Sequence, residues 1–258
     1  MDNLDILKTM KSNLIDLIYI DPPFFSGVDY EEFSDQWSSI KEYLNFLSFR
    51  MKEMHRVLKE RGSFYCHCDS NAVFELKPLC DEIFGKEQFK RDIIWNVGSI
   101  SGFKSKKKGW IRQHDFILYY TKTSEYTFNK QYMPYKEDYI KKMFRYKDED
   151  GRLYRKRRNG KQYLDEKPGN MVGDVWDDIL SYQTRTRSKE YTGYPTQKPI
   201  ELLERIILAS SNEGDLFADF FCGSGTSLVA AKKHHRNWIG IDINPKAIEL
   251  CKSRLQIK

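Results

Sequence analysis

The sequence of 258 residues has no apolar run that approaches the roughly 20 residues needed for a membrane helix. Its first residues, Met1 to Asp5, lack the basic and apolar regions of a secretory signal peptide. Charged residues make up 31% of the chain and hydrophobic residues 40%, and the length is enough to bury a full core. We therefore expect a globular protein of the cytoplasm that does not associate with a membrane.

The chain has five cysteines, Cys66, Cys68, Cys80, Cys222 and Cys251, and four of them have apolar neighbours in the sequence and are expected to be buried. The odd count argues against a disulfide framework and suits a reducing compartment. Cys66-His67-Cys68 has the residue types of a zinc site, but the chain lacks a second ligand pair at metal spacing, so we expect no metal. The chain also lacks Gly-Lys-Ser and Gly-Lys-Thr, which argues against a nucleotide-hydrolysing phosphate loop.

Acidic residues are sparse in the middle of the chain. Residues 98–192 contain 22 lysines and arginines but 13 acidic residues, a net charge of +9, whereas the remainder carries −3. Aromatic residues are interleaved with this positive charge, a composition that can follow a nucleic-acid backbone and stack on bases. The alternative is a solvated, partly disordered basic insert. The candidate DNA-contacting residues are Lys104, Lys106, Lys107, Lys108, Arg155, Arg157 and Arg158.

A short apolar run, Leu17 to Ile20, ends abruptly at Asp21-Pro22-Pro23-Phe24. The run predicts a buried parallel strand whose carboxyl end is Asp21. That edge of an open α/β sheet is where ligands bind, so a carboxylate held there suits an active site. The two prolines stiffen the loop and leave carbonyl oxygens free to accept hydrogen bonds. An ordinary Asp-Pro turn at the end of a strand is the alternative.

The remaining patterns alternate between helix and strand. Apolar residues recur at helical spacing from Ile40 to Leu58 until Gly62, and the next helix is expected over Ala72–Phe84, with Pro78 as a kink or break. Another helix begins at Pro199. Strands are expected at Ser63–Cys68, Ile93–Trp95, Phe116–Tyr120, Asp215–Phe221 and Trp238–Ile243. This alternation predicts an α/β fold with a mostly parallel, doubly wound sheet.

A glycine turn follows the strand that ends at Phe221. Cys222-Gly223-Ser224-Gly225-Thr226 opens a helix, so its glycines let a ligand approach the backbone closely. Asp242 follows Gly225 by 17 residues, at the end of the next expected strand, where an acidic residue can accept hydrogen bonds from both ribose hydroxyls. Leu228 occupies the position of the third glycine that a dinucleotide site prefers. Asn244 and Pro245 predict the start of a final helix.

Three of these segments resemble motifs of one enzyme group. Asp21-Pro22-Pro23-Phe24 and Phe221-Cys222-Gly223-Ser224-Gly225 resemble the motif pair of S-adenosylmethionine-dependent DNA amino-methyltransferases of the restriction-modification type. Tyr194-Pro195-Thr196-Gln197-Lys198-Pro199 resembles the motif that precedes the cofactor loop, and Asp2-Asn3-Leu4 resembles the end of a further cofactor motif. The order, with the catalytic motif first and the cofactor motif last, is that of the β group. Phe220, Ser227 and Tyr194 replace a frequent proline, threonine and histidine.

The resemblance implies a class I methyltransferase sheet in permuted order, with a catalytic half (1–97), a last strand and basic target-recognition insert (98–192) and a cofactor-binding half (193–258). It implies that S-adenosylmethionine lies on the glycine loop, with Asp242 on the ribose hydroxyls. Asp219 either faces the same pocket or orients the loop as a hydrogen-bond acceptor. The implied cofactor-binding residues are Phe221, Cys222, Gly223, Ser224, Gly225, Thr226, Asp219, Asp242, Thr196 and Lys198.

The implied reaction is methylation of an exocyclic amine. Asp21 and the Pro22 carbonyl would accept the two amine hydrogens, and Phe24 would stack on a base flipped out of duplex DNA. The Asp-Pro-Pro-Phe form favours N6 of adenine, with N4 of cytosine as the alternative and RNA, protein or small-molecule substrates less favoured. A binding protein without catalysis is a further alternative. The resemblance also brings a cognate restriction endonuclease and a homodimer into consideration as partners.

Overall fold

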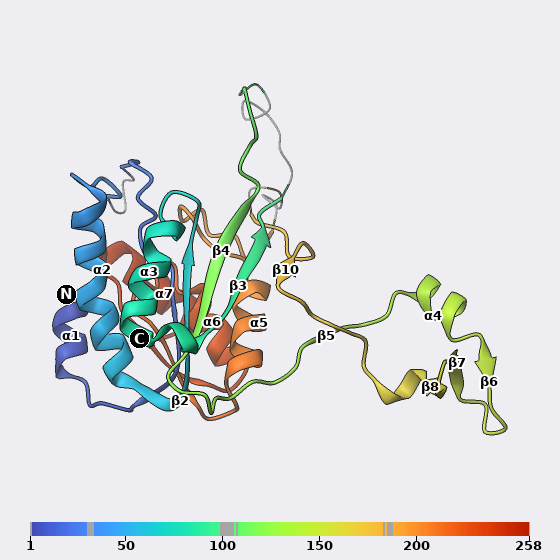
Figure 1. The fold of residues 1–258 in the computed structure, drawn as a ribbon. Coiled ribbons are helices and arrows are strands. Elements are labelled where there is room, and N and C mark those ends of the chain that lie inside the picture. Colours follow the sequence, from blue (N-terminus) through green and yellow to red (C-terminus); the bar gives the residue numbers. More distant parts are fainter. Residues whose placement is uncertain are drawn as a thin grey trace. The chain divides into compact units, whose positions relative to one another are not determined.

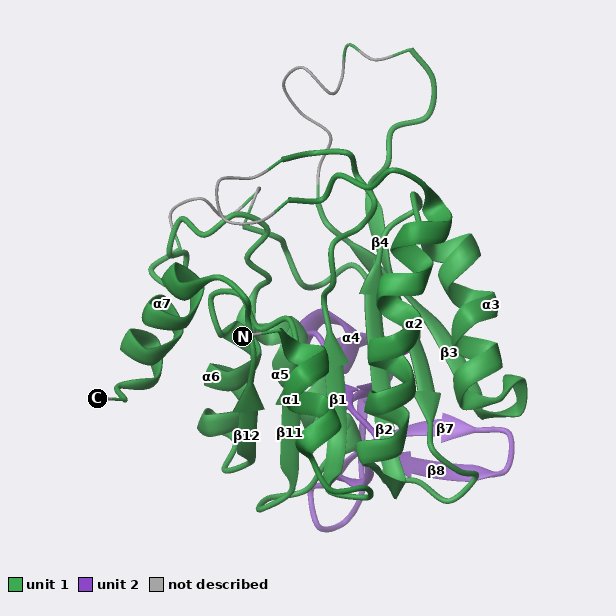
Figure 2. Ribbon diagram, turned by 90° about the vertical axis from the view of Figure 1, so that its left-hand side faces the viewer, with its two compact units in different colours: residues 1–129, 174–258 green, residues 130–173 purple. Residues whose placement is uncertain are grey.

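The computed structural model describes residues 2–29, 34–98, 106, 108–182, 184 and 188–257. The chain divides into two compact units, residues 1–129 with 174–258 and residues 130–173 (Figure 2). The smaller unit lies inside the 98–192 segment expected to hold the target-recognition insert, and the boundaries expected from the sequence stay a prediction. Lys104 and Lys107, two of the expected DNA contacts, lie outside the described residues.

The larger unit is built on a seven-stranded sheet with the order β10-β3-β4-β2-β1-β11-β12. Strand β4 is antiparallel to both of its neighbours, and the other pairs are parallel. This confirms the predicted α/β class with a mostly parallel sheet. The strands are β1 (Ile15–Ile20), β2 (Leu58–Cys68), β3 (Phe89–Asn96), β4 (His114–Thr121), β10 (Val175–Trp176), β11 (Leu216–Asp219) and β12 (Asn237–Gly240).

Helices cover both faces of this sheet (Figure 1). On one face α1 (Asn3–Thr9) and α3 (Val73–Phe84) pack beside α2 (Ile40–Val57), and the short turn η1 (Lys86–Gln88) follows α3. The other face carries α5 (Ile200–Ser210) and α6 (Thr226–Lys233), with α7 (Pro245–Leu255) packed beside α6. Within the described part of the chain, no helix is long and apolar enough to cross a membrane.

Local sequence explains most of these boundaries. Ser39 caps α2 by accepting a hydrogen bond from the Glu42 amide, and Asn244 caps α7 by accepting one from the Lys246 amide, as expected at helix starts. The helix expected to run to Leu58 ends one residue earlier, because Leu58 already pairs with Ile15 at the start of β2. Pro78 lies inside α3 and does not end it.

Two elements differ more from what the sequence patterns predict. The first helix, α1, was not predicted; its N-cap Asp2 accepts a hydrogen bond from the Leu4 amide and also pairs with Arg50 on α2. The strand expected over Trp238–Ile243 ends at Gly240, where pairing with β11 stops at Asp219. Asp242 consequently lies in the loop after β12 rather than within the strand.

The smaller unit has its own short elements. A two-stranded pair, β5 (Tyr132–Met133) with β9 (Asn170–Met171), brings its two ends together. Between them lie α4 (Glu137–Met143), η3 (Leu164–Glu166) and a three-stranded sheet of β6 (Tyr146–Lys147), β7 (Leu153–Arg157) and β8 (Gly160–Tyr163).

Aromatic rings and cations hold this small unit together. Phe144 is 1% exposed and packs on Tyr135 and Tyr139. Arg155 is also buried, bonded to Gln162 and to the Tyr139 hydroxyl and lying over the Phe144 ring. Arg155, expected from the sequence to contact DNA, therefore serves with Phe144 as a core residue of the unit, because so small a unit has few other residues to bury.

Truncation of Leu47 should weaken the fold. This fully buried residue lies on the core face of α2, so Leu47→Ala is expected to lower the free energy of unfolding by about 2–5 kcal/mol. Phe49 on the same helix is 61% exposed, and Phe49→Ala should change stability by less than about 0.5 kcal/mol. Urea denaturation of both variants tests the pair, and equal losses would contradict the assignment of these faces.

Candidate active site

Strands β1 and β11 are parallel neighbours, with Leu17 beside Phe217 and Ile18 beside Ala218. The loop after Ile20 and the loop after Asp219 therefore leave the sheet side by side at its carboxyl edge. They open onto one cavity of about 1010 Å³. Of the expected catalytic and cofactor residues, all but Gly225 line it: Asp21, Pro22, Pro23, Phe24, Thr196, Lys198, Asp219, Phe221, Cys222, Gly223, Ser224, Thr226 and Asp242.

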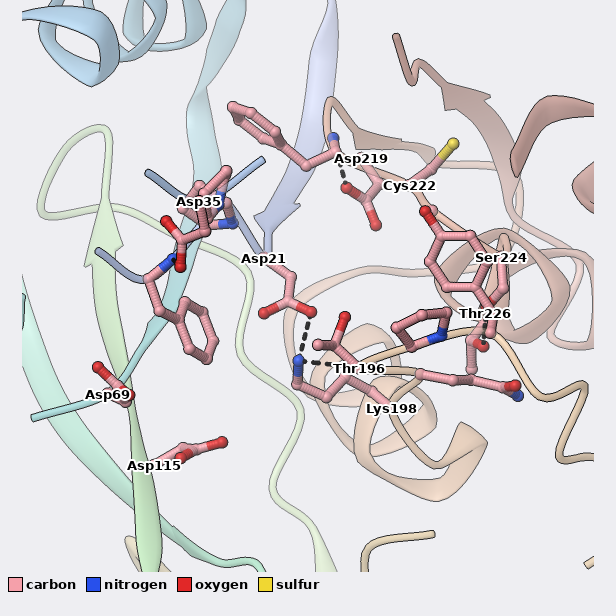
Figure 3. A pocket seen from close by; sticks show the side chains of 18 of the residues that line it. Asp21, Asp35, Asp69, Asp115, Thr196, Lys198, Asp219, Cys222, Ser224 and Thr226 are labelled. Atoms are coloured by element: carbon pink, nitrogen blue, oxygen red, sulfur yellow. Dashed lines mark hydrogen bonds and ion pairs between the residues drawn. The ribbon is translucent and has the colours of Figure 1, made fainter. Parts of the chain in front are cut away.

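Asp21 is paired with Lys198 in this cavity. The ammonium Nζ of Lys198 lies 2.5 Å from Oδ2 of Asp21, 3.3 Å from the carbonyl oxygen of Thr196 and 5.1 Å from the ring centroid of Phe24 (Figure 3). The resemblance places Lys198 beside the carboxylate of the cofactor. In the structure its ammonium group forms an ion pair with Asp21.

The two prolines after Asp21 have different surroundings. Pro22 is buried, and within the described residues no protein group donates to its carbonyl oxygen. The Pro23 carbonyl accepts a hydrogen bond of 2.8 Å from the hydroxyl of Tyr43 on α2. Tyr43 thus anchors the loop through its second proline and leaves the first carbonyl available to a ligand. No pattern in the sequence marks Tyr43 for this task.

Asp35 holds the next part of the loop. Its side chain is buried and accepts hydrogen bonds from the amides of Phe24, Phe25 and Ser26, at 2.8–3.1 Å. It also accepts one from the Ser26 hydroxyl and one from the indole of Trp37. Phe25 has a positive φ of 59°, a conformation that costs free energy outside glycine. The five bonds to one carboxylate hold the backbone in this shape and fix the position of Phe24.

The two glycines of the loop have different surroundings: Gly223 lines the cavity, whereas Gly225 lies against α7. Gly223 and Gly225 have φ values of +48° and +74°, and a Cβ at Gly225 would lie 2.4 Å from Sγ of Cys251. The Gly223 amide donates to Asp242, whose other oxygen accepts from the Asn244 amide. Asp242 therefore ties the loop after β12 to the glycine loop while it lines the cavity.

Asp219 does both things that the sequence left open. It lines the cavity, and it also accepts hydrogen bonds from the Phe221 amide at 3.0 Å and the Ser227 hydroxyl at 2.5 Å. Burial raises the pKa of Asp219 to about 7, with the negative charges of Asp21 and Asp242 acting in the same direction. Hydrogen bonds to the ionised form oppose this rise.

The N-terminal segment is joined to the same site. The Asn3 amide donates to the Phe220 carbonyl at 2.6 Å and its oxygen accepts from Arg50. Arg50 in turn forms two hydrogen bonds with Asp2 and lies 3.5 Å from the centroid of the Phe46 ring. Asp2, Asn3, Phe46 and Arg50 all line the cavity. The motif resemblance pointed to Asp2 and Asn3, whereas Phe46 and Arg50 carry no sequence pattern.

The family of the chain follows from comparison with known proteins. A sequence model of the family described as DNA methylase, covering N6 and N4 methyltransferases, matches residues 15–253. The chain belongs to this DNA methylase family. Membership confirms the resemblance inferred from the motifs.

Two curated relatives of this methylase match almost the whole chain. The type II methyltransferase M.HpaI of Haemophilus parainfluenzae is 34% identical over 96% of this chain and 70% of its own length. The DNA adenine methyltransferase YhdJ of Escherichia coli is 31% identical over 99% of this chain and 81% of its own length.

Solved structures share the fold. The M1.HpyAVI complex with S-adenosylmethionine matches with a TM-score of 0.65 and 20% identity, over 100% of this chain and 97% of that one. The cytosine-N4-specific PvuII DNA methyltransferase matches with a TM-score of 0.65 and 17% identity, over 98% and 84%.

Changing Asp35 to Asn tests whether the loop geometry matters for methylation. The substitution keeps the size of the side chain but turns an amide NH2 toward backbone N–H donors, so Phe24 should shift. A misplacement of about 1 Å can cost roughly 10²-fold in rate, and we expect a loss of that order in methyl transfer with unchanged folding.

The matched control is Glu42→Gln. Glu42 accepts hydrogen bonds from Ser38 in the neighbouring turn but does not line the cavity, so its replacement should leave the rate unchanged. Methyl transfer is measured in single turnovers with labelled S-adenosylmethionine. A wild-type rate in Asp35→Asn would rule out a positioning role for Asp35.

Proposed function

We propose that this methylase transfers the methyl group of S-adenosylmethionine to the N6 amine of adenine in double-stranded DNA. The observation that carries the proposal is the shared cavity: Asp21 to Phe24 and the glycine loop open onto it from neighbouring strands. Its volume of about 1010 Å³ accommodates a cofactor together with a base. The alternative within the same family is N4 of cytosine.

The acceptors beside Asp21 suit an exocyclic amine. Such an amine is a weak nucleophile because its lone pair is delocalised into the ring, and acceptors for both of its hydrogens localise that pair on nitrogen. Oδ2 of Asp21 and the carbonyl oxygen of Pro22 are the acceptors available here. The ring of Phe24 offers a stacking surface for the base. In this arrangement the lone pair is directed at the methyl group for in-line displacement.

The glycine loop fits the cofactor. S-adenosylmethionine, when bound, supplies an electrophilic methyl group on a positively charged sulfur. The loop from Phe221 to Gly225 would hold the methionine part, and Asp242 would accept hydrogen bonds from the ribose hydroxyls. Asp21 and Asp242, together with the fraction of Asp219 that is ionised near its pKa of about 7, outnumber the single positive charge of Lys198 and make the cavity favourable for a cation.

Exposed basic side chains in the smaller unit, residues 130–173, support DNA as the substrate. Arg157 and Arg158 are exposed at the end of β7, whereas Arg155 is committed to the core of that unit. Lys106 and Lys108 are also exposed. Because the amine lies inside the duplex, the target nucleotide must be flipped out at a cost of a few kcal/mol, which stacking on Phe24 and hydrogen bonds to Asp21 offset.

Adenine is favoured over cytosine by two observations. The first residue of the tetrapeptide is Asp, the form that the resemblance associates with N6 of adenine, and YhdJ is named as an adenine methyltransferase at 31% identity. The cytosine-specific structure is only 17% identical, a level at which the likeness concerns the fold. We also propose a location in the cytoplasm; a cognate endonuclease and a homodimer stay expectations from the resemblance.

The product nucleoside decides the base. Purified protein is incubated with methyl-labelled S-adenosylmethionine and genomic DNA, the DNA is digested, and the labelled nucleoside is identified. We expect the label in N6-methyldeoxyadenosine. Label in N4-methyldeoxycytidine would establish the alternative, and label in neither nucleoside would refute both assignments. Asp21→Asn is the matched control, because it keeps the shape of the side chain but should lose activity by orders of magnitude while still binding S-adenosylmethionine.

Salt dependence of DNA binding tests the exposed arginines. Removal of one contact between an arginine and a phosphate should reduce the slope of log affinity against log salt by about one, so a double Arg157→Ala, Arg158→Ala variant should show a reduction of about two. Lys141→Ala with Lys142→Ala removes the same charge from α4 of the same unit, where Lys141 already lies 3.6 Å from Glu137. Equal effects of the two double variants would contradict a specific role for the arginines.

A further inference from the structure

Behind Asp21 lies a buried polar cluster that the proposed function does not use. It consists of Tyr19 on β1, His67 on β2 and Asp115 on β4, which are adjacent strands of the sheet. His67 is fully buried, with Nδ1 2.8 Å from the Tyr19 hydroxyl and Nε2 3.3 Å from Oδ2 of Asp115. The rings of Phe24 and Trp95 enclose the imidazole, each with its centroid 5.6 Å away.

Asp21 faces this cluster with one of its two oxygens. Oδ2 is held on the cavity side by Lys198, whereas Oδ1 is buried and, among the described residues, has no hydrogen-bond partner. This Oδ1 lies 4.0 Å from Nδ1 of His67. Leaving a buried carboxylate oxygen without a donor is costly, so an unpaired oxygen directed at an imidazole indicates a functional contact.

The charged groups around His67 include one more carboxylate than cations. The carboxylates are Asp21, Asp115 and, across the guanidinium of Arg112, Asp69; the cations are Lys198 and Arg112. Counted as ionised, these groups leave one negative charge unbalanced when the imidazole is neutral, and an imidazolium balances it.

The two hydrogen-bond partners of His67, Tyr19 and Asp115, are compatible with both the neutral and the protonated imidazole. Burial would raise the pKa of Asp115, but the hydrogen bond and charge of His67, together with Arg112, hold it down to about 2. Asp115 is therefore a carboxylate facing Nε2–H. Burial raises the pKa of Tyr19 far above its usual range, so its hydroxyl stays neutral. That hydroxyl can donate to a bare Nδ1 or accept from a protonated one.

We propose that His67 takes up, through Asp21, the proton that leaves the target amine during methyl transfer. The inference rests on the proposed function and deepens it, because it assigns the proton a destination. His67 acts through Asp21 and does not touch the base.

Atoms and charge balance in this step. As the nitrogen–methyl bond forms, the sulfur–methyl bond breaks and its electron pair stays on sulfur, so the positive charge passes to the amine nitrogen. The proton moves from nitrogen to Oδ2 of Asp21, and rotation about the Cβ–Cγ bond turns the protonated oxygen toward His67. Transfer to Nδ1 restores the Asp21 carboxylate and forms an imidazolium beside Asp115. Nδ1 and the oxygen must approach by about 1 Å to reach hydrogen-bond distance.

The test measures methyl transfer in single turnovers against pH. In His67→Asn we expect the rate to fall by about 10²-fold or more, the usual range for loss of a proton-transfer group, with the affinity for S-adenosylmethionine unchanged by calorimetry. The acidic limb of the profile should move to lower pH, because an imidazole titrates well above a carboxyl group in model peptides. Asp115→Asn should lower the rate by less, and the acidic limb of its pH profile should also move to lower pH.

Tyr65→Phe is the matched control. It removes another buried hydroxyl from β2, bonded to Ser210 rather than to the cluster, and should leave both rate and pH profile unchanged. A wild-type rate in folded His67→Asn would overturn the proposal. So would a slow variant that keeps the wild-type pH profile, since that result fits a packing role. If His67→Asn does not fold, the rate and the pH profile of Asp115→Asn decide in its place. A wild-type protein that methylates no DNA base would refute the proposed function rather than the role of His67.

Discussion

The parallel pairing of β1 with β11 is the contact on which the site depends. It joins two segments from opposite ends of the chain, so that the loop after Ile20 and the loop after Asp219 leave the sheet at one edge. Both strands are short and almost entirely buried, and a shift of register by one residue would turn every side chain to the wrong face. The hydrophobic core therefore sets the relation between the Asp21 loop and the glycine loop.

Around this contact the loops are held by single polar residues rather than by packing alone. Asp35 fixes the backbone after Pro23, Tyr43 fixes the carbonyl of Pro23 itself, and Asp242 fixes the amide of Gly223. Asp35 bonds within the loop after β1, whereas Tyr43 reaches that loop from α2 and Asp242 reaches the glycine loop from the loop after β12. The loop after β1 is thus tied to itself and to α2, and the loops after β11 and β12 are tied to each other, which reduces the free energy that must be spent on ordering the site.

The features predicted correctly from sequence are those with local causes. Strands such as β1 are short apolar runs stopped by proline, and α7 begins where Asn244 and Pro245 follow one another. Asp21 to Phe24 and the glycine loop could be recognised because their chemistry requires consecutive residues. The pairing of Lys198 with Asp21 and the burial of Arg155 arise from long-range contacts, for which neighbouring residues give no signal. His67 was visible only as part of a rejected zinc pattern, since its hydrogen-bond partners come from two other strands, β1 and β4.

The pairing of β5 with β9 affects how the sequence of such a methylase can diverge in evolution. The chain enters and leaves residues 130–173 through strands that are hydrogen-bonded to each other, with Tyr132 opposite Met171. The entry and exit points thus stay a fixed strand spacing apart whatever lies between them. Residues inside that closed loop can be exchanged, lengthened or shortened without altering the path between β4 and β10, so the fold allows one part of the protein to diversify while the methyl-transfer chemistry is kept.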